Sequence, residues 1–274
     1  MSPAARGFAD DAAVLEVGGA TLVLTHDIMV EGVHFLAAQD MADVAWKLVA
    51  VNLSDLAAKG AVPLGVLLGY QLGADDAAFL HGLAEALAAF DVPLLGGDTV
   101  GGDPPRSFGM TAIGRASHVP VPSRAGARPG DGVWLTGQVG AAMIGFEAVR
   151  DGTGAESAAY RRPAPRLAEG RALAPVVTAM MDVSDGLLLD SWRLAAASGV
   201  TLTLERAHIP VADPDRPDAC CRWGDDYELL FTLPAGMQPP VAATRIGIVE
   251  RAGRTPLKVD HNEIKSSTGL GYTH

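Results

Sequence analysis

Apolar residues in the first half of the chain form short strand-like runs separated by two helix-like stretches. The runs AAVLEV and TLVLTHDI flank Gly18-Gly19, a pattern typical of two strands joined by a turn. From Asp43 to Ala58 the apolar residues recur at helical spacing, which predicts a helix with Asp43 as N-cap and Gly60 as its stop. Further runs predict strands over residues 63–72, 92–97 and 107–115 and a helix over 76–90 capped by Asp75. The pattern therefore predicts a mixed α/β first half.

The stretch HVPVPSRAGARPGDG is rich in Pro and Gly and is the best candidate for a domain boundary. We place the junction near residues 120–123, which gives domains 1–122 and 123–274. Beyond it, the pattern predicts strands over 132–137, 180–183, 201–205, 227–233 and 243–249 and helices over 140–152, 167–177 and 184–199. The last helix is expected to begin at Ser184 or Asp185. The predicted fold class is α/β (α+β), and 274 residues are enough for two such domains.

Composition and charge narrow the possible partners. The net charge of −11 argues against a nucleic-acid partner, because binding to a phosphate backbone depends on clustered Lys and Arg. An anionic ligand would need cations to mediate its binding. Cys220 and Cys221 are adjacent and poorly placed to bridge with each other. We see no secretory h-region and no apolar stretch long enough to span a bilayer, so we expect a cytoplasmic protein without a membrane partner.

Acidic residues occur in six short clusters that lie beside glycines or at the edges of apolar runs. The clusters are Asp10-Asp11, Asp27 with Glu31, Asp55, Asp98, Asp182 with Asp185, and Asp225-Asp226 with Glu228. Any single Asp is more often a solvated surface residue. A charge within an apolar segment is costly, however, unless it is paired or bound to metal. Asp55 would also lie near the negative end of a helix dipole, so the clusters together predict a site for hard cations.

Common nucleotide-binding and hydrolase motifs are absent: the chain has no GK dipeptide, GxGxxG, GxSxG or HExxH. The word GGDT instead places two glycines beside Asp98 and Thr99, where backbone groups could approach a phosphate or a cation. A simple turn is the alternative. His34 lies among apolar residues, where a histidine is more often a hydrogen-bonded core residue than a ligand.

The word MDVSDG places Asp182 and Asp185 around Ser184 at a predicted helix start. These carboxylates could cap the helix, and a helix N-terminus can also bind phosphate. Arg124 and Arg128 lie in the Gly/Pro loop and could hold polyphosphate oxygens, although a solvated loop would look the same.

Taken together, the words GFADDAAVL, THDIMVEGVHF, VAVNLSDLAAKGA, GGDT, SRAGARPGD, RRPAPR, MDVSDGLLLD and GDDYELLF resemble thiamine-monophosphate kinases. This family belongs to the superfamily of aminoimidazole ribonucleotide synthetase and selenophosphate synthetase. The resemblance covers nearly the whole chain, in order, and implies two mixed-sheet domains with the N-terminal sheet forming a homodimer. It also implies transfer of the γ-phosphoryl group of ATP to thiamine monophosphate. The acceptor phosphate is itself the nucleophile, so direct in-line transfer needs alignment and charge neutralisation but no general base.

The resemblance implies roles for residues that match the family's motifs. Several Mg²⁺ ions would be held by Asp11, Thr25, His26, Asp27, Asp55, Asp98, Asp182 and Asp185. ATP, the co-substrate, would be held by Gly97, Asp98, Arg124 and Ser184, and thiamine monophosphate by His34, Asp225 and Tyr272.

The chain departs from the family pattern at several positions. Ala9-Asp10-Asp11 replaces the usual GDD, and His26 stands at a position that is normally Ser or Thr. Asp225 is one methylene shorter than the usual glutamate, and Lys59 stands where methionine is common. Two alternatives therefore stay open: an ATP-using enzyme with a different small-molecule acceptor, or a catalytically silent protein that binds metal or nucleotide.

Overall fold

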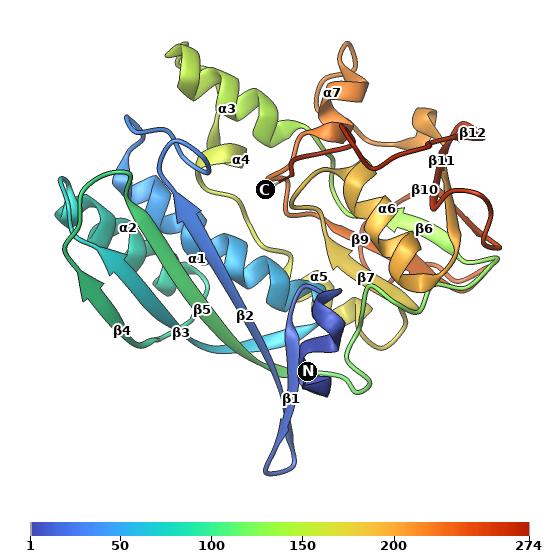
Figure 1. Cartoon of the computed structure of the whole chain (residues 1–274), viewed down its shortest axis with the longest axis horizontal. Coiled ribbons are helices and arrows are strands. Elements are labelled where there is room, and N and C mark those ends of the chain that lie inside the picture. The colour runs from blue at the N-terminus through green and yellow to red at the C-terminus, as the bar shows by residue number, and fades with distance from the viewer. Residues whose placement is uncertain (1, 274) are drawn as a thin grey trace.

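The first half of the chain is a five-stranded mixed sheet with two helices on one face (Figure 1). The computed structural model describes residues 2–273. The elements are a short 3-10 helix Pro3–Phe8, β1 Ala13–Val17, β2 Ala20–Val30, α1 Met41–Ala58, β3 Ala61–Gln71, α2 Asp76–Ala89, β4 Leu94–Val100 and β5 Ser107–Ala116. The strand order is β1-β2-β5-β3-β4, and only β3 and β4 run parallel to each other. The strands and helices predicted for this half are all present.

Of the two helix caps predicted for this half, Asp43 is wrong, and Asp75 has the predicted position without a side-chain capping bond. Helix α1 begins at Met41, and its N-cap is Asp40, whose carboxylate accepts a hydrogen bond from the Ala42 amide at 2.9 Å. Asp43 lies in the first turn instead and pairs with two arginines of the second half. Asp75 occupies the N-cap position of α2, but its backbone is left-handed (φ +62°) and its side chain makes no capping hydrogen bond.

The two faces of the first sheet differ in what covers them. Residues of β2 alternate, so Val23, Thr25 and Met29 are buried on the face covered by α1, whereas His26 and Ile28 are exposed on the outer face. The outer face and the edge strand β4 also expose large apolar side chains. These include Leu67, Leu94 and Leu95. An apolar sheet face of this kind is typical of an interaction surface.

The second half is a seven-stranded mixed sheet with helices on both faces. Its elements are β6 Gly132–Leu135, α3 Ala141–Asp151, α4 Ala158–Arg161, α5 Leu167–Leu173, β7 Ala179–Asp182, α6 Leu187–Ser198, β8 Thr201–Leu204, a 3-10 turn Arg206–His208, α7 Pro217–Arg222, β9 Leu229–Leu233, β10 Thr244–Glu250, β11 Leu257–Val259 and β12 Asn262–Glu263. The strand order is β12-β11-β8-β10-β6-β9-β7, with β8 and β11 parallel and the other pairs antiparallel. Two mixed-sheet α/β domains are therefore present, as the sequence predicts.

A shared apolar cluster joins the two halves. One face of the second sheet packs against α6, whereas Trp134 and Phe231 on the other face pack with Ala57 of α1 and Leu173 of α5. Helices α1 and α5 approach closely, because a Cβ on Gly170 would lie 2.0 Å from the Ala57 carbonyl oxygen. The end of α1 is therefore held between the sheets. It lies near the start of β1 and the end of β7, where Asp11 and Asp182 occur. Within residues 2–273 we find no helix with the length and apolar character needed to cross a membrane.

Candidate active site

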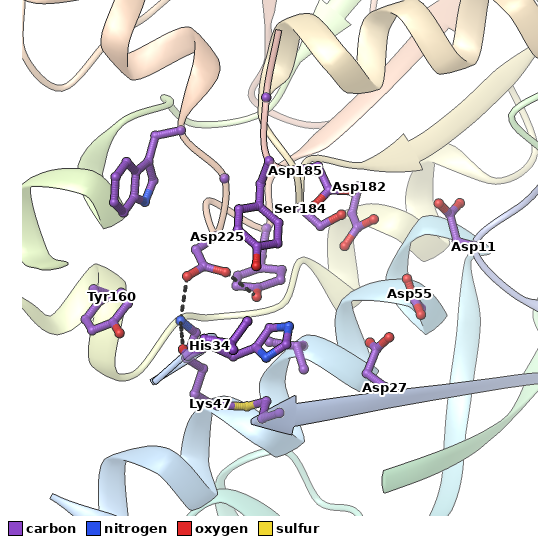
Figure 2. A pocket seen from close by; sticks show the side chains of 18 of the residues that line it. Asp11, Asp27, His34, Lys47, Asp55, Tyr160, Asp182, Ser184, Asp185 and Asp225 are labelled. Atoms are coloured by element: carbon purple, nitrogen blue, oxygen red, sulfur yellow. Dashed lines mark hydrogen bonds and ion pairs between the residues drawn. The ribbon is translucent and has the colours of Figure 1, made fainter. Parts of the chain in front are cut away.

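A cavity of about 590 Å³ lies between the two halves. Its walls come from residues 10–55 of the first half and residues 124–272 of the second half. The volume is in the range of small-molecule binding sites. Carboxylates gather at one end, and His34, Lys47 and aromatic side chains gather at the other (Figure 2).

Carboxylates from three separate elements converge at the acidic end. Asp11 precedes β1, Asp55 lies in the last turn of α1, and Asp182 ends β7. One oxygen from each of these three side chains lies within 4.8 Å of the other two. Asp27 of β2 points toward the same space (Figure 2). Three or four carboxylates around one point form a set of hard oxygen donors of the kind that Mg²⁺ prefers, so these residues fit a divalent cation.

The electrostatics of the cluster point to the same ligand. Burial, followed by the charges of Asp27, Asp182 and Asp11, raises the pKa of Asp55 well above its ordinary value. Burial and the charge of Asp11 raise the pKa of Asp182 to about 8, although the hydroxyl of Ser54 donates to it at 2.6 Å. The raised pKa values of Asp55 and Asp182 mean that a bound cation would favour the ionised forms of these carboxylates.

Two protein cations already contact the outer part of this cluster. The guanidinium of Arg124 donates to Oδ1 of Asp11 from Nε at 2.7 Å, and its Nη2 is 2.5 Å from the same oxygen. The fully buried ammonium of Lys59 lies 2.5 Å from Oδ2 of Asp11. Arg124 was expected to hold ATP, and its position at the cavity wall is compatible with that role.

Asp190, which the sequence analysis did not single out, accepts hydrogen bonds from the segment after β7. Helix α6 begins at Leu187, so the predicted start at Ser184 or Asp185 is corrected to a point just beyond them. The amides of Ser184 and Asp185 donate to Oδ2 of the buried Asp190 at 3.1 and 3.0 Å. These two amides are therefore already hydrogen-bonded within the chain, and Ser184 lines the cavity.

The other end of the cavity is built around a buried lysine. Nζ of Lys47 lies 2.5 Å from Oδ2 of Asp225, 3.4 Å from the His34 carbonyl oxygen and 4.1 Å from the centre of the Tyr160 ring (Figure 2). The hydroxyl of Tyr227 donates to Oδ1 of Asp225 at 2.8 Å. Asp225 has a left-handed backbone (φ +64°), and its carboxylate accepts from Lys47 of α1. The sequence analysis missed Lys47, although a lysine on the apolar face of a predicted helix was a usable signal.

The structure brings together most, but not all, of the predicted site residues. Asp11, Asp27, His34, Asp55, Arg124, Asp182, Ser184, Asp185, Asp225 and Tyr272 line the cavity. Thr25 lies just behind it and donates to the carboxylate of Asp55.

His26, Gly97 and Asp98 do not join the cluster within one chain. Strand alternation puts His26 on the outer face of β2, where its Nδ1 lies 2.9 Å from the Thr111 hydroxyl. Asp98 is on edge strand β4, three strands away from β2, and pairs in register with the outer-face residue Gly69. The side chains of His26 and Asp98 therefore project from the face of the sheet opposite the cluster, and their roles in binding metal and ATP stay predictions.

Comparisons with known proteins agree over most of the chain. Residues 9–116 match the family model "AIR synthase related protein, N-terminal domain", and residues 128–255 match "AIR synthase related protein, C-terminal domain". The thiamine-monophosphate kinase of Caulobacter vibrioides is 40% identical over 253 residues, which cover 84% of this chain and 72% of that protein. The enzyme of the same name from Escherichia coli K12 is 36% identical over 252 residues, covering 83% and 76%.

Two solved structures have a similar fold over most of this chain. The structure described as "AaThiL complexed with AMPPCP and TMP" has a TM-score of 0.86 and 28% identity and covers 94% of this chain and 89% of that one. The thiamine monophosphate kinase of Aquifex aeolicus has a TM-score of 0.84 and 27% identity, with 93% and 92% covered. The family models and the curated relatives cover both mixed-sheet domains, and the solved structures share their fold. This chain therefore belongs to the thiamine-monophosphate kinase family.

Proposed function

We propose that this protein transfers the γ-phosphoryl group of ATP to thiamine monophosphate, giving thiamine diphosphate and ADP. One observation carries the proposal: the carboxylates of Asp11, Asp55 and Asp182 converge in a cavity whose far end is lined by cationic and aromatic side chains. The solved relative described as complexed with AMPPCP and TMP supports it, because that protein holds an ATP analogue and TMP. A cytoplasmic location is part of the proposal, since Cys220 and Cys221 are both free thiols.

The acidic end is the proposed magnesium and triphosphate site. Asp11, Asp27, Asp55 and Asp182 would hold the ions, with Asp185 at the rim of the same cavity. Bound Mg²⁺ would neutralise and align phosphate oxygens. The protein's own contribution is to keep the carboxylates convergent and the cavity enclosed, which aligns donor and acceptor without a general base.

The opposite end is the proposed acceptor site. Rings of Tyr160 and Tyr227 and the side chain of His34 provide flat surfaces for an aromatic heterocycle. Lys47 holds Asp225 at this end, and Tyr227 fixes the other oxygen of the same carboxylate. We propose that Asp225 and Tyr272 contact thiamine monophosphate and that the Lys47 ion pair fixes the orientation of Asp225.

We further propose a homodimer formed through the outer face of the first sheet. Ile28 is 52% exposed on that face, and Leu67 is 39% exposed nearby. In this dimer His26, Gly97 and Asp98 would lie near the partner's sheet. Residues of the second chain could then complete the metal and ATP sites predicted for these three positions. Ile28→Asp should convert the dimer to a monomer in light scattering, whereas Leu80→Asp, at an exposed position of α2, should not. A wild-type protein that is monomeric at micromolar concentration would refute this part of the proposal.

Phosphorus NMR tests the activity directly. The protein is incubated with MgATP and thiamine monophosphate, and matched samples leave out the acceptor or Mg²⁺. Formation of thiamine diphosphate and ADP only in the complete sample is expected. MgATP hydrolysis or transfer with another acceptor would indicate the different-acceptor alternative, and MgATP binding without any turnover would indicate a silent homologue.

A further inference from the structure

Lys59 is a fully buried lysine whose ammonium lies against the carboxylate cluster. Its Nζ is 2.5 Å from Oδ2 of Asp11 and 3.3 Å from the carbonyl oxygen of Met180, and it forms an ion pair with Oδ1 of Asp10. The side chains of all three charged residues are at most 2% exposed. A lysine loses a large hydration energy on burial, and close pairing with carboxylates offsets that cost.

Local structure fixes where this ammonium lies. Lys59 is the C-cap residue of α1 and follows Asp55 by four positions, so the two side chains share one side of the helix end. A cation at this position also interacts favourably with the helix dipole. A Cβ on the next residue, Gly60, would lie 2.4 Å from the Cβ of Ala174, so the close contact with α5 leaves this helix end little freedom to move.

Cations are distributed unevenly over the cluster. Asp10 pairs with Lys59 and with Arg6, whose Nη1 is 2.7 Å from Oδ2. Asp11 pairs with Lys59 and Arg124. Each of these two carboxylates therefore contacts two protein cations.

The inner carboxylates have different partners. Asp55 receives a hydrogen bond from the hydroxyl of Thr25, and Asp182 receives one from the hydroxyl of Ser54. These donors are neutral, so protons or a ligand cation must balance the charge of the inner pair. The protein has thus placed its own cations on one side of the cluster and none of these ion pairs on the other.

We propose that Lys59 is a fixed internal cation of this site. It is a positioning residue that holds Asp10 and Asp11 in place and supplies positive charge that a divalent ion would otherwise supply. The chain then keeps its carboxylates together without metal, and it binds divalent ions chiefly through Asp27, Asp55 and Asp182, with Asp11 shared between Lys59 and the ions. This inference rests on the magnesium site of the proposed function. It is measured as metal binding and folding stability, so it can fail while the kinase activity stands.

The test is Lys59→Met, which keeps the length and packing of the side chain but removes its charge. Mn²⁺ binding is followed by electron paramagnetic resonance in the full-length protein without nucleotide. Removing one positive charge a few ångströms from the ligands should tighten Mn²⁺ binding on the order of tenfold. The midpoint of thermal unfolding in EDTA should fall by about 5 °C or more, and excess Mg²⁺ should restore most of that loss.

Two further variants separate charge from packing. Lys59→Arg keeps the charge and should retain the wild-type Mn²⁺ affinity. Lys47→Met removes the other buried, ion-paired lysine, which contacts Asp225 rather than the cluster, so its loss of stability should not be restored by Mg²⁺.

If Lys59→Met does not fold, Lys59→Gln provides the same measurement, because it also removes the positive charge while its neutral amide can still donate a hydrogen bond to Asp10 or Asp11. Unchanged Mn²⁺ affinity in whichever variant folds, or stability losses at Lys59 and Lys47 that respond equally to Mg²⁺, would overturn the proposal.

Discussion

Replacing Asp55 with Asn should stabilise the metal-free protein and severely impair catalysis. An oxygen of Asp55 lies within 4.8 Å of carboxylate oxygens of Asp11 and Asp182, and Asp55 accepts a hydrogen bond from the neutral hydroxyl of Thr25. Two unit charges at that distance repel by about 3 to 4 kcal/mol at an effective dielectric constant of about 20. Partial protonation of the cluster and the cations on Asp11 reduce this repulsion, so we expect a net gain of about 2 kcal/mol at pH 8.

The pH dependence of this gain has a definite sign. The pKa of Asp55 is raised in the folded protein, so folding favours its protonated form. Stability from this group is therefore present below the ordinary carboxyl pKa and is lost as pH rises toward the raised value. The advantage of the Asn variant in EDTA should grow with pH over that range.

Urea unfolding in EDTA and in excess Mg²⁺ measures the stability side, and steady-state kinetics measure the activity. With Mg²⁺ the order should reverse, because bound ions stabilise the wild type more than a variant that has lost a ligand. Loss of one proposed metal ligand at a phosphoryl-transfer site should lower kcat/KM by at least about a hundredfold.

Asp43→Asn is the matched control. Asp43 is buried in the same helix, but its oxygens lie 2.6 and 2.5 Å from Arg161 and Arg162. This variant should be less stable than the wild type in both EDTA and Mg²⁺. The reasoning about Asp55 is refuted if its Asn variant is destabilised in EDTA at pH 8, or if it keeps activity within tenfold of the wild type.

Two other predictions concern Asp226 in the second half and Gly97 on edge strand β4. Burial raises the pKa of Asp226 to about 8 despite hydrogen bonds from the Gly140 amide, so stability should fall by up to about 1.4 kcal/mol per pH unit between pH 4 and 8. Asp226→Asn should flatten that slope in urea titrations across pH, and an unchanged slope would exclude this carboxylate as its source. A Cβ on Gly97 would lie 1.9 Å from the Leu68 carbonyl oxygen, so Gly97→Ala should separate β4 from β3 and cost about 2 to 3 kcal/mol in urea unfolding. Gly101→Ala, where an added Cβ meets nothing within 4 Å, should cost far less, and equal losses would contradict the steric argument.

Local sequence patterns predicted most elements but misplaced their ends. The spacing of apolar residues identified α1, yet Asp40 and Asp43 both precede helical runs, and which of them caps is decided by the arginines that engage Asp43. The start of α6 was placed too early for a similar reason. Asp190, one turn into the helix, takes the amides of the preceding loop and delays the first helical residue. The short elements α4, α7, β11 and β12 carry too few residues for a periodic signal.

Candidate ligands were easier to predict than their grouping. Acidic residues in apolar words stand out because an unpaired buried charge is costly. The same reasoning could not tell that Asp27 joins the cluster and Asp98 does not, because each is a carboxylate in an apolar, strand-like segment. Sheet order and strand alternation placed Asp98 on the far edge of the sheet and on its outer face.

The sequence by itself determined most of the strands and helices, the division into two α/β halves and the set of carboxylates able to bind a cation. These properties depend on neighbours along the chain, through periodicity, turn residues and the cost of a charge in an apolar run. Only the tertiary structure decided that Asp11, Asp55 and Asp182 meet at one point. It also decided that Lys59 and Arg124 neutralise one side of that cluster, whereas Lys47 serves the other end of the cavity. Such contacts join residues far apart in the chain and follow from how α1 and α5 pack between the two sheets, which no local pattern records.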